Sequence, residues 1–407
     1  MAQILEDELL TLSEAADLLK CHPNTLRNWD NEGLLEAVRI GERGDRKYRR
    51  KDLEKLITKN KPVDDSRIFV PSGVPKVISM FSGCGGLDLG FEQAGFRTVW
   101  ANDIYLPAAE TYRANIGPID TRPIEEIEIE AIPNGDVLLA GFPRQPFSNA
   151  GQRKGVSDPR GTLFFETLRF IDSHRPKVVV FENVKGLLSI KNSDGSKLID
   201  GIKRELEDRK YIVDYKLLTA SDYGVPQNRQ RVVIVGVLKS HSNKMFKFPD
   251  PIEKKNLELK YALKNLPKND PNDEHWELSP QSKELIKYIP EGGSWKSVPY
   301  DKLPVRLKKI RDDMKKYHSP NFYRRFGRDE IMGTITAAGT PENSGIVHSF
   351  ENRRYTVREI ARIQSFPDDF VFLGKGVSSR YKQIGNAVPP KLAYHIAKSI
   401  KEQYFNE

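Results

Sequence analysis

Cysteine is scarce in this sequence: only Cys21 and Cys84 occur among 407 residues. Two cysteines are too few for a disulfide framework or for a zinc site built on several thiolates. Scarce cysteine is also typical of proteins that stay in a reducing cytoplasm. No segment approaches the roughly 18 consecutive apolar residues that a membrane-spanning helix requires. The first residues lack the basic and apolar regions of a secretory signal. We therefore expect a soluble, cytoplasmic protein that holds no metal ion and does not contact a membrane.

An excess of one charge sign is present but modest. The 65 Lys and Arg residues outnumber the 56 Asp and Glu residues, which gives a formal net charge of +9. Such an excess is compatible with a polyanionic partner and does not identify one. The length of the chain predicts two or three domains with a core of ordinary size.

The first 60 residues carry the pattern of a small helical module. Thr11-Leu-Ser-Glu14 has the form of a capping box, which predicts a helix from there to Lys20. Pro23 suits the first turn of a second helix that ends near Gly33. Two short helices joined by a tight turn predict a helix-turn-helix. A third helix is expected over 52–57.

Basic residues gather just after the second expected helix. Seven of them lie between positions 39 and 51, within and around a Gly-Glu-Arg-Gly-Asp stretch (41–45) that predicts a hairpin turn. The segment resembles the winged helix-turn-helix of MerR-like and excisionase-like DNA-binding proteins. The resemblance implies major-groove contacts from the second helix and phosphate contacts from the wing. The residues expected to bind DNA are Asn24, Thr25, Arg27 and Asn28 on the helix, and Arg46 and Arg49 on the wing. A solvated, charged helical cap without nucleic acid contact is the alternative.

Beyond a linker at 61–75, apolar runs alternate with helical patterns. Val77–Phe81 runs into the turn Ser82-Gly-Cys-Gly-Gly86 and a helix from Leu87 to Ala94. A strand, a glycine turn and a helix N-terminus form the opening unit of a doubly wound α/β fold, where the backbone approaches a ligand closely. Asp88 stands where a dinucleotide site requires its third glycine, which disfavours NAD. Asp103, twenty residues after Gly83, is placed to accept hydrogen bonds from ribose hydroxyls.

Further buried strands are expected over 98–101, 137–140, 178–181 and 232–237. The second of these runs into Gly141-Phe-Pro-Arg-Gln-Pro-Phe-Ser148, and the third ends at Glu182-Asn-Val184. The carboxyl ends of parallel strands converge on the ligand crevice, so Arg144 and Glu182 are expected to face one site. A surface salt bridge is the alternative role for Glu182, and its placement beside the other polar motifs disfavours it.

Five motifs, in order and spacing, resemble those of the DNA cytosine-5 methyltransferase family. They are Phe81-Ser-Gly-Cys-Gly-Gly86, Gly141-Phe-Pro-Arg-Gln-Pro-Phe-Ser148, Glu182-Asn-Val184, Gln227-Asn-Arg-Gln-Arg231 and Gly385-Asn-Ala-Val-Pro-Pro390. The resemblance covers 76–400. It implies a Rossmann-like catalytic domain, dependent on S-adenosylmethionine, over 76–239 and 340–407. A smaller target recognition domain is expected over 240–339, after the winged helix-turn-helix at 1–60.

The family resemblance assigns a donor site and a base site. S-adenosylmethionine is expected against Gly83, Gly85, Gly86 and Leu87, with Phe81 on the adenine, Asp103 on the ribose, Asp120 near the adenine amino group and Asn386 at the methionine end. Glu182 is expected to hold the ring nitrogen and amine of a flipped-out cytosine, and Arg229 and Arg231 its carbonyl oxygen and a phosphate. Pro143, which shapes the loop, is counted with the donor site, and Gln145 and Ser148 are expected to close over DNA.

The position of the family's nucleophile is occupied by Arg144. Carbon 5 of cytosine accepts a methyl group only after a thiolate adds at carbon 6, and a guanidinium offers no nucleophile. Neither cysteine replaces it, because Cys84 belongs to the donor turn and Cys21 to the N-terminal module. Arg229 would face Arg144 as a like charge. We expect donor binding to survive and cytosine methylation to fail.

The inserted region carries mixed basic and aromatic stretches, at 290–296 and 315–326, of the kind that groove contacts require. Lys308, Lys309, Arg311, Lys315 and Lys316 are equally compatible with a solvated helix face. Arg354–Gln364 predicts an amphipathic helix that packs on the sheet.

These patterns lead to a DNA cytosine-5 methyltransferase of the restriction-modification type, with double-stranded DNA as partner, a separately encoded endonuclease as a second partner, and its nucleophile replaced. A DNA-bound regulator that keeps donor and target binding without chemistry is the alternative. An RNA methyltransferase on the same fold is disfavoured by the N-terminal module.

Overall fold

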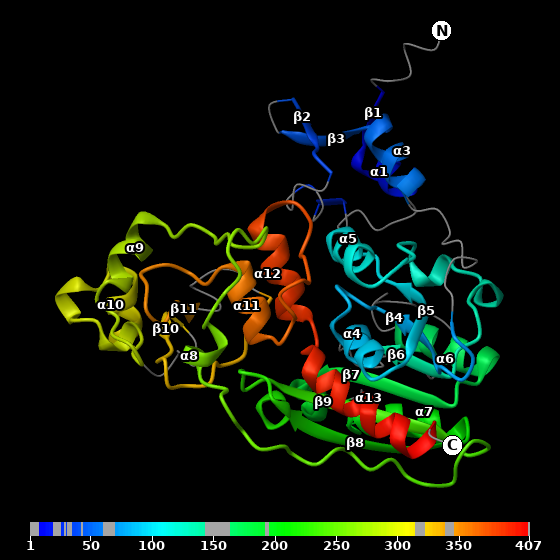
Figure 1. Ribbon diagram of the computed structural model, residues 1–407. Coiled ribbons are helices and arrows are strands. Elements are labelled where there is room, and N and C mark those ends of the chain that lie inside the picture. The colour runs from blue at the N-terminus through cyan, green and yellow to red at the C-terminus, as the bar shows by residue number, and fades with distance from the viewer. Residues whose placement is uncertain are drawn as a thin grey trace.

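The computed structural model describes residues 8–18, 26–27, 30, 35–41, 44–59, 70–142, 163–191, 195–313, 322–337 and 346–405. In Figure 1 the N-terminal module lies at the top, the main sheet with its helices at the lower right, and a smaller lobe at the left. Helices α11 (Val357–Ile363) and α12 (Gly376–Asn386) stand between the sheet and the smaller lobe (Figure 1).

The main sheet has six strands in the order β5-β4-β6-β7-β9-β8. Its strands are β4 (Lys76–Met80), β5 (Arg97–Asn102), β6 (Val137–Ala140), β7 (Val178–Val184), β8 (Tyr211–Thr219) and β9 (Gln230–Leu238). The first four strands of this order are parallel, while β9 runs antiparallel to β7 and to β8. The expected doubly wound α/β fold is confirmed, and all five expected strands are present. β8 and the reversed direction of β9 were not foreseen.

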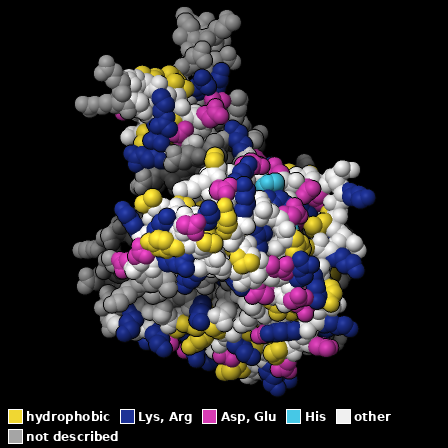
Figure 2. Space-filling model, turned by 90° about the vertical axis from the view of Figure 1, so that its left-hand side faces the viewer, with side chains coloured by type: hydrophobic (Ala, Val, Ile, Leu, Met, Phe, Trp, Pro, Cys, Tyr) yellow, Lys and Arg dark blue, Asp and Glu magenta, His cyan; other side chains and the backbone are white. Residues whose placement is uncertain are grey.

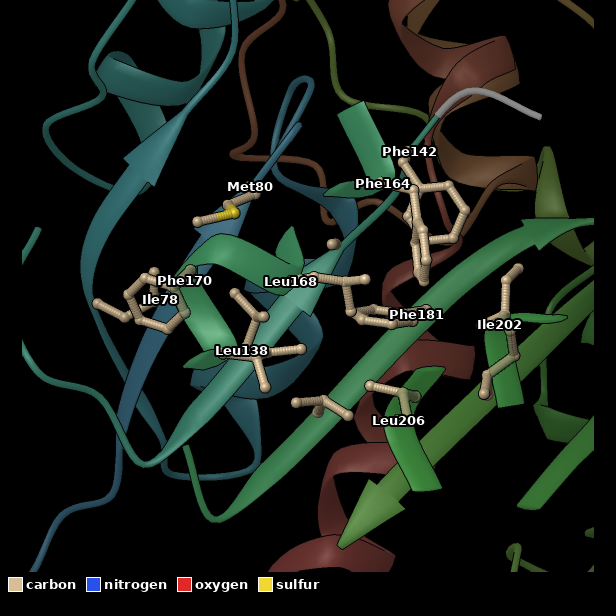
Figure 3. Packing of buried hydrophobic residues seen from close by; sticks show 14 of the residues in the cluster. Ile78, Met80, Leu138, Phe142, Phe164, Leu168, Phe170, Phe181, Ile202 and Leu206 are labelled. Atoms are coloured by element: carbon tan, nitrogen blue, oxygen red, sulfur yellow. The ribbon is translucent and has the colours of Figure 1, made fainter. Parts of the chain in front are cut away.

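Helices cover both faces of this sheet, because successive strand side chains point to opposite sides. Ile78, Leu138 and Phe181 pack on one face against α6 (Leu163–His174) and α7 (Leu198–Asp208) (Figure 3). Val77, Leu139 and Val180 belong to the opposite core, with α4 (Gly86–Gln93) and α13 (Pro390–Tyr404). Helix α5 (Leu106–Asn115) follows β5. Short 3-10 turns occur at 124–126, 129–131, 185–189, 220–223, 295–297 and 300–302.

The smaller lobe has a hydrophobic core of its own around Trp295, Phe322 and Ile286. Its elements are α8 (Leu259–Ala262), α9 (Pro280–Ile286), α10 (Val305–Asp312), β10 (Arg324–Arg325) and β11 (Ile346–Val347). A further cluster joins Leu259 and Met332, from the region expected to recognise the target, to side chains of α11 and α12. The two regions therefore share a core along their border, and the division at 239 and 340 remains a prediction.

The N-terminal module is built from β1 (Leu9–Thr11), α1 (Leu12–Leu18), β2 (Val38–Ile40), β3 (Asp45–Arg49) and α3 (Arg50–Lys59). The capping box is confirmed, since the Thr11 amide donates to Glu14 Oε2 at 2.7 Å and the Glu14 amide donates to Thr11 Oγ1 at 3.3 Å. The expected hairpin is confirmed by antiparallel pairing of β2 with β3. The pairing of β1 with β3 was not foreseen. Most of the second expected helix lies outside the described residues.

Candidate active site

Three strand ends of the main sheet meet at one edge, where β4, β6 and β7 finish. A Cβ atom added to Gly141, the residue after β6, would lie 3.7 Å from Glu182 Oε2 and 3.7 Å from the Phe81 carbonyl oxygen. Glu182 stands inside β7, in register with Val233 of β9, whereas the sequence analysis placed it just beyond the strand. Since β9 is antiparallel, its beginning lies at the same edge and brings Arg231 opposite Val184.

Glu182 and Arg231 form a nearly buried charge pair at this edge. Arg231 Nε lies 2.6 Å from Glu182 Oε1, and the two side chains are 9% and 12% exposed. Burial raises the pKa of Glu182 above the ordinary glutamate value, although Arg231 and Arg229 oppose the change. A carboxyl whose pKa is raised by burial gives up its proton less readily to water and is suited to sharing one with a bound base.

Asn183, which the sequence analysis passed over, holds the neighbouring loop. Its Nδ2 donates a hydrogen bond to the Phe142 carbonyl oxygen at 2.9 Å. Phe142 is the last described residue before 143–162, which lie outside the described residues. The Phe142 ring packs against Phe164 and Phe181 in the core. The start of the loop that carries position 144 is thereby fixed beside Glu182. The position of Asn183 inside the Glu-Asn-Val motif was the signal that could have found it.

Arg229 is completely buried, and both of its terminal nitrogens bind backbone. Nη1 donates to the Ile335 carbonyl oxygen and Nη2 to the Gly385 carbonyl oxygen, each at 2.6 Å. Burial lowers its pKa, and Arg231 nearby acts in the same direction. The structure thus shows Arg229 joining two segments that are far apart in the sequence. The contact with a base or phosphate that was expected of it stays a prediction.

The glycine turn after β4 has the geometry of a ligand cradle. Phe81, Gly83 and Gly85 have φ angles of 58°, 58° and 87°, in the left-handed region. A phenylalanine in this region is uncommon and marks a constrained site. The Gly83 amide donates to Asp103 Oδ2 at 2.8 Å and the Tyr105 amide donates to Asp103 Oδ1 at 2.8 Å, while the space beside the Gly83 Cα is open. Burial raises the pKa of Asp103.

Two other residues expected in the donor site have defined surroundings. Asp120 lies beside Asp103, because the Asp103 amide donates to the Asp120 carbonyl oxygen at 3.1 Å. Both Asp120 carboxylate oxygens accept hydrogen bonds from Arg122 Nε, so any adenine amino group would share them with this guanidinium. The Leu87 side chain packs in the core between α4 and the sheet, and the donor contact expected of Leu87 stays a prediction.

The C-terminal motif packs directly on the glycine turn. A Cβ atom on Gly86 would lie 2.3 Å from the Val388 carbonyl oxygen, so only glycine permits this approach. Asn386, at the end of α12, is exposed two residues before Val388. Phe81, Gly83, Asp103 and Asn386 therefore derive from segments that meet around one turn.

Cys84 lies within this turn but faces the core. It is 2% exposed, its sulfur contacts the Gln383 carbonyl oxygen at 3.7 Å, and burial raises its pKa to about 12. A buried thiol with such a pKa is not a nucleophile at neutral pH.

Several residues of the expected site lie outside the described residues. They are Arg144, Pro143, Gln145 and Ser148 in the loop after β6, and Asn24, Thr25 and Asn28 in the N-terminal module, together with Cys21.

The wing of the N-terminal module is partly neutralised by its own acidic partner. Asp30 accepts from Arg39 Nη2 at 2.5 Å and from Arg46 Nε at 2.6 Å. Arg46, which was expected to bind phosphate, is thus paired within the module. Arg27 and Arg49 are exposed. Figure 2 shows Lys and Arg side chains on the module at the top, and both charge signs intermixed over the side of the molecule below it.

Helix α10 of the smaller lobe carries basic residues that could either contact DNA or form a solvated helix face. Arg311 donates to the Val298 carbonyl oxygen at 2.9 Å, and the Lys308 ammonium lies 5.4 Å from the centre of the Tyr300 ring. These contacts belong to the lobe itself and favour a structural face, while 315–316 lie outside the described residues.

The described part of the chain offers neither a membrane-spanning helix nor a cluster of metal ligands. No helix there is long and apolar enough to cross a bilayer. No group of three or more His, Cys, Asp or Glu side chains there is arranged to hold a metal ion.

Comparison with known proteins gives the family. The model of the C-5 cytosine-specific DNA methylases matches residues 75–402, and a helix-turn-helix domain model matches residues 9–61. The chain belongs to the C-5 cytosine-specific DNA methylases. The type II methyltransferase M.NgoFVII of Neisseria gonorrhoeae is 42% identical over 82% of this chain and 88% of its own length. The type II methyltransferase M.Eco47II of Escherichia coli is 35% identical over 98% and 97%.

Solved structures agree on the fold of this methylase. The methyltransferase EhMeth of Entamoeba histolytica matches with a TM-score of 0.56 and 19% identity, over 81% of this chain and 98% of its own. The Dnmt2 methyltransferase of S. pombe matches with a TM-score of 0.53 and 18% identity, over 81% and 99%. The expected family, its Rossmann-like domain and the N-terminal helix-turn-helix are thereby confirmed.

Proposed function

We propose that this methylase binds S-adenosylmethionine and a specific site in duplex DNA, as the modification partner of a separately encoded restriction endonuclease, and that Arg144 blocks its methyl transfer. The family match and the type II relatives support the reaction class. The single observation that carries the proposal is the fixed start of the loop after β6, within contact distance of Glu182. The loop that bears position 144 therefore begins at the base site.

The residues around the glycine turn fit the proposed donor. Phe81 offers an aromatic face, Asp103 a carboxylate for ribose hydroxyls, and the open space beside Gly83 lets a ligand approach the backbone. Asn386 would meet the methionine end from the C-terminal motif. The donor supplies an activated methyl group on a cationic sulfur, which aromatic and acidic neighbours stabilise.

The pair of Glu182 and Arg231 suits a cytosine drawn out of the double helix. Carbon 5 of a stacked base is inaccessible, so the base must leave the stack before any reaction. Glu182, whose pKa is raised by burial, would donate a proton to the ring nitrogen and accept from the exocyclic amine. Protonation of the ring makes carbon 6 more open to attack, which is the step that requires a nucleophile.

No described residue supplies that nucleophile. A thiolate would add at carbon 6, and after methylation of carbon 5 it would leave as the proton at carbon 5 is removed. A guanidinium remains protonated and has no lone pair to offer. Cys84 is buried with a raised pKa, and it contacts the backbone of α12. Arg144 would also add a positive charge close to the Arg231 and Arg229 pair.

The test restores the missing sulfur. The chain and its Arg144→Cys variant are incubated with a randomised duplex library and methyl-labelled donor, and incorporation is read by scintillation and by bisulfite sequencing. We expect label at one sequence with the cysteine variant and none above the blank with the parent. The double variant Arg144→Cys/Glu182→Gln is the control, and should lose most of the restored activity. Robust incorporation by the arginine form would refute the proposed block.

A regulator without catalysis is the second candidate function. The observation that favours it is an N-terminal module with its own core around Ala15, Leu26 and Tyr48, and with an exposed wing residue, Arg49. Footprinting of the full chain on DNA upstream of its own gene tests this role. A discrete protected site that disappears in the Arg49→Ala variant supports it, whereas protection only at the sequence methylated by Arg144→Cys contradicts it.

A further inference from the structure

Two buried glutamines connect the target-side segment to the C-terminal motif. Gln227 and Gln364 are both fully buried, and the Gln227 Nε2 donates to the Gln364 Oε1. Gln227 Oε1 accepts from the Ile335 amide at 3.0 Å, and Gln364 Nε2 donates to the Ala387 carbonyl oxygen at 2.7 Å. Each amide group thus uses its oxygen and its nitrogen within one chain of hydrogen bonds.

Arg229 closes this chain into a ring. Its two terminal nitrogens donate to the carbonyl oxygens of Ile335 and Gly385, both at 2.6 Å. The backbone of Ile335 is therefore held at its amide by Gln227 and at its carbonyl by Arg229. On the opposite side of the ring, the carbonyls of Gly385 and Ala387 are held by Arg229 and Gln364.

Asn386 is the residue enclosed by these two carbonyls. The ring holds the peptide group that precedes Asn386 and the one that follows Ala387, while the Asn386 side chain stays exposed. The approach at this point is close, because a Cβ atom on Gly385 would lie 2.4 Å from the Thr336 carbonyl oxygen. The backbones of the two segments therefore pack against each other with no side chain between them.

We propose that Gln364, through the Ala387 carbonyl, is a positioning residue that aims Asn386 at the donor and ties it to the segment at 332–336. This inference rests on the proposed function for the contact between Asn386 and the donor. Buried amides suit this role, since an unsatisfied carbonyl or amide in such a ring is costly and the ring keeps one geometry. The segment at 332–336 and the donor contact should consequently respond to each other.

A single-atom change in Gln364 tests the proposal. In Gln364→Glu the ionised carboxylate still accepts from Gln227 but has no proton to donate to Ala387, whereas the protonated carboxyl has one. Affinity for S-adenosylhomocysteine is measured by calorimetry between about pH 5.5 and pH 8.5. We expect affinity about tenfold weaker than the parent's at high pH, with recovery on acidification. Gln364→Met, which donates at no pH, should show a loss without recovery.

Gln383→Glu is the matched control. Gln383 is also a buried glutamine, and its Nε2 donates to the Leu373 carbonyl oxygen at 2.8 Å while its Oε1 accepts from Thr111 Oγ1 at 2.6 Å. It undergoes the same chemical change but does not hold the peptide groups around Asn386. Titration of Glu182 or Asp103 would change donor affinity in the parent chain and in this control as well. A recovery of affinity at low pH therefore supports the proposal only if it is confined to Gln364→Glu. Burial of this position favours the protonated carboxyl, whereas the Arg229 guanidinium in the same ring favours the ionised one, and the balance sets the pH at which recovery begins.

The outcomes separate this inference from the proposed function. If the parent binds no S-adenosylhomocysteine, the donor assignment fails and this inference fails with it. If the parent binds but Gln364→Glu follows the Gln383→Glu control at every pH, only the positioning role is overturned. Hydrogen exchange of the parent provides a measurement that needs no variant. Donor should slow exchange of the Ile335 amide, and an unchanged rate with saturating donor would also overturn the link.

Discussion

Asp88 carries a buried carboxyl under the glycine turn, and its replacement by asparagine should stabilise the chain at neutral pH. The side chain is completely buried in α4, and Tyr112 donates its hydroxyl to Oδ1 at 2.9 Å. Burial raises the pKa of Asp88 from 3.8 to about 6, against the opposing effect of the Ser79 and Tyr112 hydroxyls.

The sign of the effect follows from this raised pKa. Below the unfolded pKa both states are protonated and the carboxyl costs nothing. As pH rises toward the folded pKa, the unfolded chain releases its proton first, so stability is lost. The whole shift corresponds to about 3 kcal/mol. About half of this should be lost between pH 5 and pH 7.5, and the asparagine variant should not show this loss.

Urea unfolding of the parent and of Asp88→Asn, at intervals between about pH 5 and pH 7.5, measures the difference directly. Circular dichroism follows the helices, and hydrogen exchange of peptides from β4 and β5 reports on the domain that contains Asp88. The gain in stability of the variant should grow with pH. A gain that is the same at both ends of the range, or that shrinks as pH rises, would refute the reasoning from burial.

Two other predictions concern a buried ion pair and the arginines of the wing. Arg358→Met should destabilise the chain by about 3–5 kcal/mol in the same unfolding assay, because it leaves the Asp270 carboxylate buried without its cation. Arg358 Nε lies 2.7 Å from Asp270 Oδ2, and both side chains are nearly inaccessible to solvent. A loss below about 1 kcal/mol would contradict a stabilising role for this ion pair. Arg49→Ala should lower the slope of log affinity against log salt for duplex DNA by about one, whereas Arg46→Ala should lower it less because Arg46 is held in an ion pair with Asp30 inside the module. If the slope for Arg49→Ala equals that of the parent chain, the wing does not contact phosphate through Arg49.

The local elements of this methylase were largely readable from the sequence. The runs at 137–140 and 178–181 are continuous apolar strands, and the Thr11–Glu14 pattern specifies a capping box, because each depends on neighbours only a few residues away. β8 was missed because its side chains are of mixed burial and it lies at the edge of the sheet. Its apolar pattern is therefore weaker than that of a central strand.

The partners of the site residues were much less readable. Arg229 was expected at a substrate, yet its terminal nitrogens bind backbone carbonyls of residues more than a hundred positions away in the sequence. Arg46 was expected on DNA and is paired with Asp30. Gln364 and Asn183 had no assigned role, although both hold backbone groups of the site. Long-range hydrogen bonds of this kind leave no periodic signal in the sequence.

By itself, the sequence determined the family, five of the strands in the main sheet and the chemical identity of residue 144, because motifs and apolar periods are local properties. Only the tertiary structure decided which groups are buried together: the pairing of Glu182 with Arg231, the ring around Asn386 and the buried carboxyl of Asp88. Burial and pairing arise when distant segments close around one another. The pKa values and the geometry of the site are therefore set by the folded chain.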